Sequence, residues 1–190
     1  MTLLSVVTVV LDDRKGLEAT AASLATQTWS DFEWIVKDGG STDGTRDVLE
    51  TIEPRPARIA SGRDGGIYGA MNAALALCSG EWVLFLNAGD TLCSPQTLAD
   101  VATWLTSTDR DWGFGAVRNI DASGNATGFQ SASPFNISGL AIGQTTVPHQ
   151  ATFMRRDLLE RLGGFATDFG TEADQELIYR AALQGLPFEM

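Results

Sequence analysis

The feature of the sequence that most constrains its fold is an alternation of short apolar runs and helix-like segments before residue 106. Each run is four to seven residues long and rich in β-branched or aromatic side chains, which is typical of a buried strand. The segments between the runs repeat apolar residues at helical spacing. Strands that alternate with helices favour a parallel, doubly wound α/β sheet. The expected strands are 5–11, 32–37, 58–61 and 82–86, and the expected helices are 14–26, 46–52 and 67–78.

A fourth helix is expected to open at Ser94-Pro95, with Ser94 as N-cap and Pro95 as its first residue. After Thr106 the strict alternation ends. The Gly- and Ser-rich stretch 131–146 predicts a loop or lid. The other expected elements are strands 112–117, 127–130 and 151–154, a hairpin-like turn NIDASGN, and helices 157–162 and 171–184.

The charge and the apolar pattern exclude several classes of protein. The 190 residues carry 13 Lys and Arg against 24 Asp and Glu, a net charge of −11, which disfavours non-specific binding to nucleic acid or to an anionic membrane. No apolar run is long enough for a transmembrane helix, and the apolar N-terminus lacks the basic region of a signal peptide. Cys78 and Cys93 have no metal-binding spacing and are expected to be reduced thiols, and the lone His149 excludes a site of several histidines.

Polar residues gather where the four expected strands end. In an open parallel sheet, ligands bind outside the carboxyl ends of the strands, and glycines at 39, 40, 65, 66 and 89 would let a ligand approach the backbone. The sequence has no Walker or GxGxxG phosphate loop. Carboxylates at strand ends can instead accept hydrogen bonds from a base or ribose, or hold a divalent cation against a diphosphate. The polar residues at the strand ends are Asp12, Asp13, Asp38, Arg63, Asp64, Asn87 and Asp90.

Together these features predict a nucleoside-diphosphate site, and at this point the chain resembles a known family. The similarity is to inverting family 2 glycosyltransferases with the GT-A fold, and it extends over nearly the whole chain. The matching segments are SVVTVVLDD (5–13), QTWSDFEWIVKDGGSTDGT (27–45), RDGGIYGAMNAAL (63–75), GEWVLFLNAGD (80–90), and HQATFMRR with the later EADQELIYR (149–180).

The resemblance implies a single GT-A domain, 1–190, with a mainly parallel sheet flanked by helices. Residues 1–106 would bind the nucleotide, and residues 107–190 would face the acceptor. The implied donor is a nucleotide-diphosphate sugar, and the implied acceptor is a saccharide or lipid-linked saccharide. Members of the family build cell-surface polysaccharides, so the resemblance implies a cytoplasmic enzyme at the inner face of the membrane. They often continue with further helices, so we expect that this chain is short or truncated and that membrane association would use residues absent from it.

The resemblance also assigns donor-binding residues. Asp38 would accept a hydrogen bond from the base, Thr8 and Leu11 would line the base, and Arg63 and Asp64 would lie near base and ribose. Asn87 and Ala88 would contact the donor as well. His149 and Gln150 are candidates for contacts with the diphosphate, the metal or the acceptor, with a structural role for His149 as the alternative. Arg155 and Arg156 are candidates for phosphate or acceptor contacts, with a solvated pair as the favoured alternative.

Asp90 corresponds to the acidic, metal-binding motif of the family and would hold Mn²⁺ or Mg²⁺. Where many members carry Asp, this chain has Asn87 and Gly89. Because Mg²⁺ is commonly held by one or two carboxylates plus phosphate oxygens, we expect metal binding to depend on the nucleotide. The alternative for Asp90 is an Asx-turn or a helix cap.

An inverting transfer needs a general base, and the resemblance assigns that role to Asp174. Helical spacing supports an inward position, since Asp174 is followed at i+3, i+4 and i+7 by Leu177, Ile178 and Ala181. The alternative is a capping box with Thr171, and Glu172 is the second candidate for the base.

Two other functions remain open at this stage. A non-catalytic module that only binds nucleotide or saccharide would explain the acidic residues missing at positions 87 and 89. A nucleotidyltransferase is less favoured, because VVLDDRKG is a poor match to the Gly-rich, basic phosphate loop of such enzymes.

Overall fold

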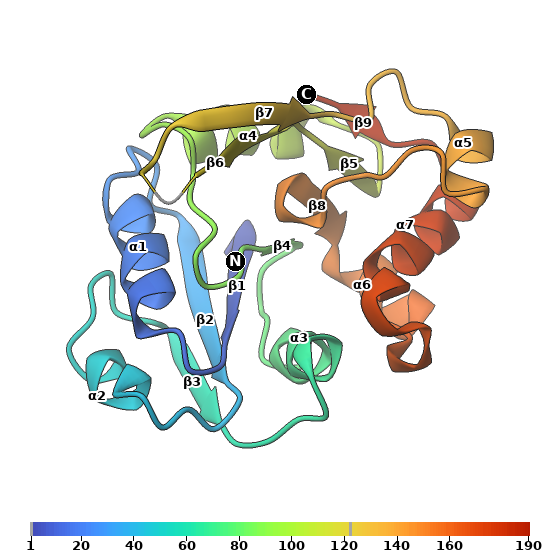
Figure 1. Cartoon of the computed structure of the whole chain (residues 1–190). Helices are drawn as coiled ribbons and strands as arrows, with labels where there is room; N and C mark the ends of the chain where they lie inside the picture. The colour runs from blue at the N-terminus through green and yellow to red at the C-terminus, as the bar shows by residue number, and fades with distance from the viewer. Residues whose placement is uncertain (1, 122) are drawn as a thin grey trace.

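The structure is a computed structural model that describes residues 2–121 and 123–190. Its centre is a seven-stranded sheet with the strand order β3-β2-β1-β4-β8-β5-β9, and β6 pairs with β7 in a separate hairpin (Figure 1). The strands are β1 (Leu4–Val10), β2 (Phe32–Asp38), β3 (Arg58–Ser61), β4 (Trp82–Phe85), β5 (Trp112–Phe114), β6 (Val117–Ile120), β7 (Ala126–Gln130), β8 (Thr152–Arg155) and β9 (Phe188–Glu189).

The first four strands are parallel, as the alternating pattern predicts. β1 pairs with β2 on one side and β4 on the other, and β3 extends the sheet beyond β2. On the other side β8 runs antiparallel to β4, and β5 runs antiparallel to β8. The fold is therefore α/β with a mainly parallel sheet, and the carboxyl ends of β1 to β4 lie along one edge.

Helices cover both faces of the sheet because successive side chains of a strand point to opposite faces. Val7 and Val9 of β1 belong to a core shared with α3, α6 and α7, whereas Val6 and Val10 belong to a core shared with α1 and α4. The helices are α1 (Arg14–Ala25), α2 (Thr45–Leu49), α3 (Ile67–Leu75), α4 (Thr97–Ser107), α5 (Ile137–Ala141), α6 (Arg156–Leu162) and α7 (Ala173–Gln184), with 3₁₀ turns η1 (His149–Ala151) and η2 (Thr167–Glu172).

The structure departs from the sequence expectations mainly after β4. Helix α4 begins at Thr97 rather than at Pro95, because Ser94 accepts the N–H bonds of Gln96 and Thr97 in a preceding turn. The expected loop 131–146 contains α5, which Asn136 caps by accepting the N–H groups of Ser138 and Gly139.

The expected strand 112–117 is two strands, of which β5 joins the main sheet and β6 joins the hairpin. The predicted turn between β6 and β7 includes residue 122, which lies outside the described residues. The short C-terminal strand β9 was not expected, and it pairs parallel with β5.

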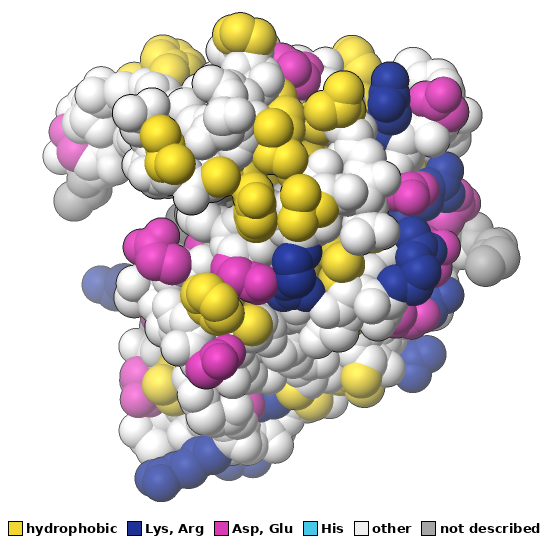
Figure 2. All heavy atoms as spheres, turned by 90° about the vertical axis from the view of Figure 1, so that its right-hand side faces the viewer, with side chains coloured by type: hydrophobic (Ala, Val, Ile, Leu, Met, Phe, Trp, Pro, Cys, Tyr) yellow, Lys and Arg dark blue, Asp and Glu magenta, His cyan; other side chains and the backbone are white. Residues whose placement is uncertain are grey.

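Large apolar side chains remain exposed on the C-terminal half of the chain. Figure 2 shows hydrophobic side chains gathered in the upper part of the face on which α5 and α7 lie in Figure 1. Ile142, Leu183 and Leu186 are each more than half exposed. Among the described residues, no helix combines the length and the apolar character needed to cross a membrane.

Glu33 ties the start of β2 to the turn before β4. Its carboxylate accepts hydrogen bonds from Ser5 Oγ at 2.6 Å and Gly80 N at 3.0 Å, and from both the amide and the hydroxyl of Ser79. Burial raises the pKa of Glu33, but these hydrogen bonds outweigh it and leave the pKa below its ordinary value.

We expect Glu33→Gln to lower the free energy of unfolding at neutral pH by about 1 kcal/mol, because it weakens charge-assisted hydrogen bonds of a partly buried group. A carboxyl whose pKa is lowered by folding stabilises the protein above its unfolded pKa and loses that effect as pH falls through the folded pKa. The difference from wild type should therefore shrink in acid, which urea unfolding at about pH 7 and about pH 3.5 measures. Glu50→Gln, at an exposed position, serves as the control, and an equal loss in both variants would contradict the assignment.

Candidate active site

The ends of β1 and β2 and the start of α3 enclose a cavity of about 690 Å³, here called the β1–β3 cavity. Leu11 and Asp12 line it from the end of β1, Gly39 from the end of β2, and Arg63 and Asp64 from the loop after β3. Leu11 is 62% exposed, so its side chain is available to a ligand. Three of the predicted donor residues, Leu11, Arg63 and Asp64, therefore share one cavity.

Thr8 and Asp38 are placed elsewhere, inside the protein. Thr8 is fully buried, donates its hydroxyl to Leu86 O at 2.8 Å and accepts the indole N–H of Trp34 at 2.9 Å. Even-numbered side chains of β1, including Thr8, point to the face covered by α1 and α4, and the contact of Thr8 with a base stays a prediction.

Asp38 is also fully buried, and its carboxylate accepts the N–H of Ser41 at 2.9 Å and the hydroxyl of Ser61. Burial raises the pKa of Asp38, but the hydrogen bonds from Ser41 and Ser61 outweigh burial and leave the pKa below its ordinary value. This carboxylate holds the turn after β2 against β3, and the hydrogen bond that Asp38 would accept from a base stays a prediction.

The two acids that follow β1 also serve the local backbone. Asp12 accepts the N–H of Thr42 at 2.7 Å, and Asp13 caps α1 by accepting the N–H of Gly16 at 2.9 Å. Of the polar groups at the strand ends, these two are therefore explained by turns and caps.

Lys37 is a residue of this cavity that the sequence reasoning missed. Its ammonium group is buried, donates to the carbonyl oxygens of Asp38 and Gly62, and pairs with Asp64 at 2.7 Å. Lys37 thereby fixes the loop that carries Arg63, which is exposed at the cavity and has no ion-pair partner among the described residues. The signal in the sequence was a lysine one residue before the end of a buried strand.

The turn after β4 carries Asn87 and Asp90. Asp90 N donates to Asn87 O at 3.0 Å, and Gly89 adopts a φ of +92°, which favours glycine. The buried hydroxyl of Thr20 in α1 donates to Asp90 O at 2.8 Å and accepts the N–H of Gly89 at 3.1 Å. Thr20, also unnoticed in the sequence, therefore holds this turn in place.

Burial raises the pKa of Asp90, and nearby His149 and the Asn87 amide only partly oppose this effect. The side chain does not cap α4, which begins at Thr97. No group of three or more His, Cys, Asp or Glu residues within 2–121 and 123–190 is arranged to hold a metal. A hard divalent cation therefore fits at Asp90 only when oxygen atoms of a ligand complete its coordination shell.

A chain of hydrogen bonds links this turn to Asp174. Asn87 Nδ2 lies 3.3 Å from His149 Nε2, and His149 Nδ1 lies 3.1 Å from Asp174 Oδ2. With the Asn87 amide in this orientation Nδ2 donates to Nε2, and Nδ1 of His149 then carries a proton that it donates to Asp174. Asn87, His149 and Asp174 are thus brought together from the turn after β4, from η1 and from α7.

Gln175, a third residue missed in the sequence, supports this arrangement. Its side chain accepts the N–H of Val147 and donates to the carbonyl of Val147, both at 2.9 Å, which fixes the segment before His149 to α7. Burial raises the pKa of Asp174, but hydrogen bonds from His149 and Gln175 outweigh it and leave the pKa below its ordinary value. Asp174 is therefore an ionised and oriented carboxylate.

The alternatives considered for Asp174 do not fit this geometry. Thr171 lies in the 3₁₀ turn η2, and the N-cap of α7 is Glu172, which makes no side-chain capping bond, so no capping box forms. Glu172 is exposed, whereas Asp174 is 13% exposed and faces inward as the helical spacing predicts. Tyr68 of α3 closes the site by donating to Thr171 O at 2.9 Å, and burial together with the charge of Asp174 raises its pKa to about 12.

The remaining predicted residues lie outside the chain of hydrogen bonds from Asn87 to Asp174. Ala88 donates its N–H to Val9 O at 3.1 Å, which joins the turn after β4 to β1. Gln150 lines a cavity together with Asp90. Arg155 pairs with Glu81, and Arg156 pairs with Glu160, so neither arginine belongs to the site.

The structure matches known glycosyltransferases. A mannosyltransferase from Pyrobaculum calidifontis, solved in complex with GDP-Man and Mn²⁺, superposes with a TM-score of 0.72 at 24% identity over 98% of this chain and 53% of that chain. The fold is therefore the GT-A fold of nucleotide-sugar glycosyltransferases.

The sequence comparisons identify the family. Residues 5–163 match the family model described as Glycosyl transferase family 2. An uncharacterized glycosyltransferase of Mycobacterium tuberculosis is 37% identical over 94% of this chain and 68% of its own length. A PGL/p-HBAD biosynthesis glycosyltransferase of the same species is 32% identical over 94% of this chain and 69% of its own length. The chain belongs to glycosyl transferase family 2, and it spans about two thirds of these relatives and about half of the solved mannosyltransferase.

The buried pair between Lys37 and Asp64 yields a prediction. Lys37→Met removes the only ion-pair partner of a buried carboxylate within the described chain, and we expect it to lower the free energy of unfolding by about 3–5 kcal/mol. The double variant Lys37→Met/Asp64→Asn should recover some of this loss, because no buried charge is left unpaired.

Arg14→Met is the matched control, since the Arg14–Glu18 pair has side chains that are 52% and 45% exposed. Breaking that pair should change stability by less than about 1 kcal/mol. Denaturant unfolding measures all three variants, and a Lys37→Met loss as small as that of the control would contradict the role of the buried pair.

Proposed function

We propose that the protein transfers a sugar from a nucleotide-diphosphate sugar to a hydroxyl acceptor with inversion at the anomeric carbon. The observation that carries this proposal is the position of Asp174, an inward carboxylate hydrogen-bonded to His149 and linked through Asn87 to the turn that holds Asp90. Family membership, and a structural neighbour that binds GDP-Man and Mn²⁺, support a nucleotide-sugar donor.

The nucleotide would occupy the β1–β3 cavity, with Leu11 against the base and Arg63 and Asp64 near the base and ribose. Asp90, with Asn87 and Ala88 beside it, would face the diphosphate. A bound Mn²⁺ or Mg²⁺ would supply positive charge to the leaving diphosphate. With one carboxylate at the turn, the phosphate oxygens must complete the metal site, so metal and donor would bind together.

Asp174 would act as the general base. Hydrogen bonds from His149 and Gln175 keep its carboxylate ionised, so it can take the proton of the acceptor hydroxyl as that oxygen attacks the anomeric carbon. The new C–O bond forms while the bond to the diphosphate breaks, and the diphosphate leaves with the electron pair. Attack from the face opposite the leaving group inverts the anomeric carbon.

The biological setting follows from the relatives. One of them is a PGL/p-HBAD biosynthesis glycosyltransferase and another is an O-antigen biosynthesis protein of Myxococcus xanthus. We propose that this chain acts in the synthesis of cell-surface saccharides, on a saccharide or lipid-linked saccharide, in the cytoplasm at the inner face of the membrane. The competing proposal, a module that binds the donor without transferring its sugar, rests on Asn87 and Gly89 in place of acids.

The base is tested with Asp174→Asn, which keeps the shape of the side chain and removes its basicity. We expect transfer to fall by about 10²- to 10⁴-fold, while binding of nucleoside diphosphate with Mn²⁺ stays near that of wild type. Transfer is measured with a panel of nucleotide sugars, and binding by calorimetry. Glu172→Gln is the control, and retained transfer in Asp174→Asn would move the base elsewhere. Binding without transfer by wild type across the panel would favour the module.

The metal site is tested with Asp90→Asn. Because the remaining amide is a weak ligand for a hard cation, we expect Mn²⁺-dependent binding of UDP or GDP to weaken by at least about tenfold, with the fold retained. Calorimetry with and without Mn²⁺ measures the effect, and circular dichroism checks the fold. Asp109→Asn, at a side chain that is 95% exposed, is the control. Wild-type affinity in Asp90→Asn would show that the metal binds elsewhere.

A further inference from the structure

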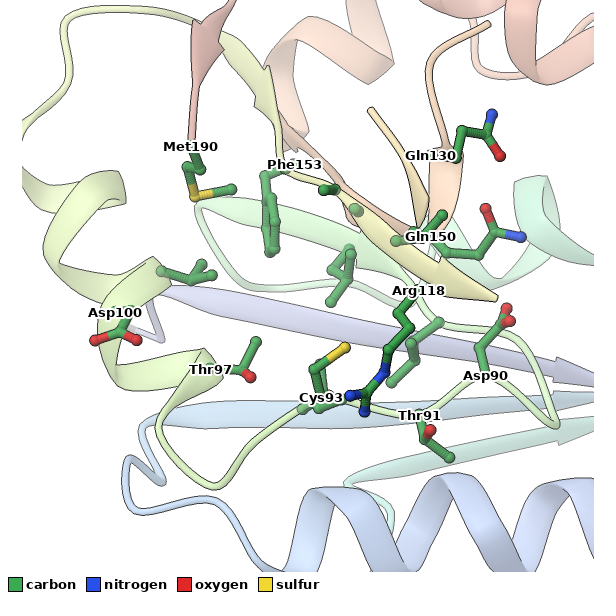
Figure 3. A pocket seen from close by; sticks show the side chains of 18 of the residues that line it. Asp90, Thr91, Cys93, Thr97, Asp100, Arg118, Gln130, Gln150, Phe153 and Met190 are labelled. Carbon is green, nitrogen blue, oxygen red and sulfur yellow. The ribbon is translucent and has the colours of Figure 1, made fainter. Parts of the chain in front are cut away.

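A second large cavity, of about 610 Å³, lies between the turn after β4, helix α4 and the β6–β7 hairpin. It is here called the α4 cavity, and Figure 3 shows it from close by. It shares no lining residue with the β1–β3 cavity. We propose that the α4 cavity binds the apolar, non-sugar portion of the acceptor, an aliphatic or aromatic aglycone. This inference rests on the proposed glycosyl transfer, because it assigns the acceptor side of the same site.

The α4 cavity has a continuous apolar side as well as polar groups. Its inner wall is the face of the sheet, where Leu84, Leu86 and Phe153 offer almost no exposed surface. The apolar surface that a ligand can reach includes Ile120 and Met190, which are 49% and 38% exposed. Val101 and Trp104 continue this surface on α4, and Trp104 is still 40% exposed. The volume lies in the range of small-molecule sites, which are mainly apolar with a few polar groups that fix orientation. Binding of a hydrocarbon group against such walls is favourable because it removes apolar surface from water, whereas a bare saccharide has little apolar surface to bury.

Two polar groups of the α4 cavity, Asp90 and Gln150, lie at the end next to the reaction centre. Figure 3 shows Asp90 and Gln150 at one end, with Met190 and Asp100 toward the other. Gln150 directly follows His149, whose ring contacts Asp174. An amphiphilic acceptor would therefore place its hydroxyl near Asp90 and Asp174 and extend its apolar body along α4.

Arg118 supplies the polar group for the junction between the sugar and the aglycone of such an acceptor. Its side chain extends from β6 across the α4 cavity toward Cys93 in Figure 3. Arg118 forms no ion pair with any other residue in the described segments of the chain. Its guanidinium can donate hydrogen bonds to the oxygen atoms that link sugar and aglycone, because it presents several N–H groups in one plane.

The experiment measures how affinity depends on the aglycone. Calorimetry compares methyl, n-hexyl and n-octyl β-glucosides, each below its micelle concentration, with phenyl β-glucoside as the aromatic arm. A fully buried methylene contributes about a fourfold gain in affinity, so with part of the octyl chain buried we expect octyl to bind about 30-fold more tightly than methyl. Tighter binding of hexyl glucoside than of phenyl glucoside assigns an aliphatic aglycone. Tighter binding of phenyl glucoside than of hexyl glucoside assigns an aromatic one. Equal affinities for all four glucosides would overturn the inference.

Matched variants locate the binding. Ala116→Trp and Thr97→Trp each place a bulky ring in the α4 cavity from a wall position outside the buried core, and each should abolish the gain from methyl to octyl. Ala126→Trp, on an exposed position of the same hairpin that does not line the cavity, should keep it. A gain that survives both cavity variants would place the aglycone elsewhere and contradict the inference.

Binding of UDP or GDP with Mn²⁺ is measured on the same variants and should stay at the wild-type level. Absence of nucleotide binding by the wild-type protein would count against the proposed transfer. The dependence of glucoside affinity on the aglycone is measured without any donor. The two proposals can therefore fail separately.

Discussion

The site depends on the position of β1 between two parallel partners. Val10 O accepts the N–H of Gly39 at 2.8 Å, and Val9 O accepts the N–H of Ala88 at 3.1 Å. The backbone end of one buried strand therefore anchors both the turn after β2 and the turn after β4. Because parallel strands end at the same edge of the sheet, the β1–β3 cavity and the turn that carries Asp90 lie next to each other.

Buried polar side chains then fix what the strands bring together. Lys37 holds the loop of Arg63, Thr20 holds the turn of Asp90, and Gln175 holds the segment of His149 to α7. Each of these groups is hydrogen-bonded, which offsets the free energy that burying a polar group would otherwise cost. The loops at the sheet edge are consequently positioned by the protein before any ligand binds, as the proposed transfer between two substrates requires.

The features of this arrangement that depend on local pattern could be predicted from the sequence. The four parallel strands follow from short apolar runs, and the inward position of Asp174 follows from helical spacing. The direction of Thr8 and Asp38 could not be predicted, because it depends on which sheet face and which neighbouring serine each side chain meets. Lys37, Thr20 and Gln175 act on partners more than 25 residues away, so their roles appear only when the chain is folded.

The central claim is that one edge of the sheet holds a nucleotide diphosphate and a cation between β1 and the turn of Asp90. A crystal of the protein grown with a nucleoside diphosphate and Mn²⁺, with anomalous diffraction recorded at the manganese edge, tests it most directly. We expect one anomalous peak within coordination distance of the Asp90 carboxylate, with the nucleoside in the β1–β3 cavity. A manganese peak remote from Asp90, or a nucleoside bound outside that cavity, would contradict the account.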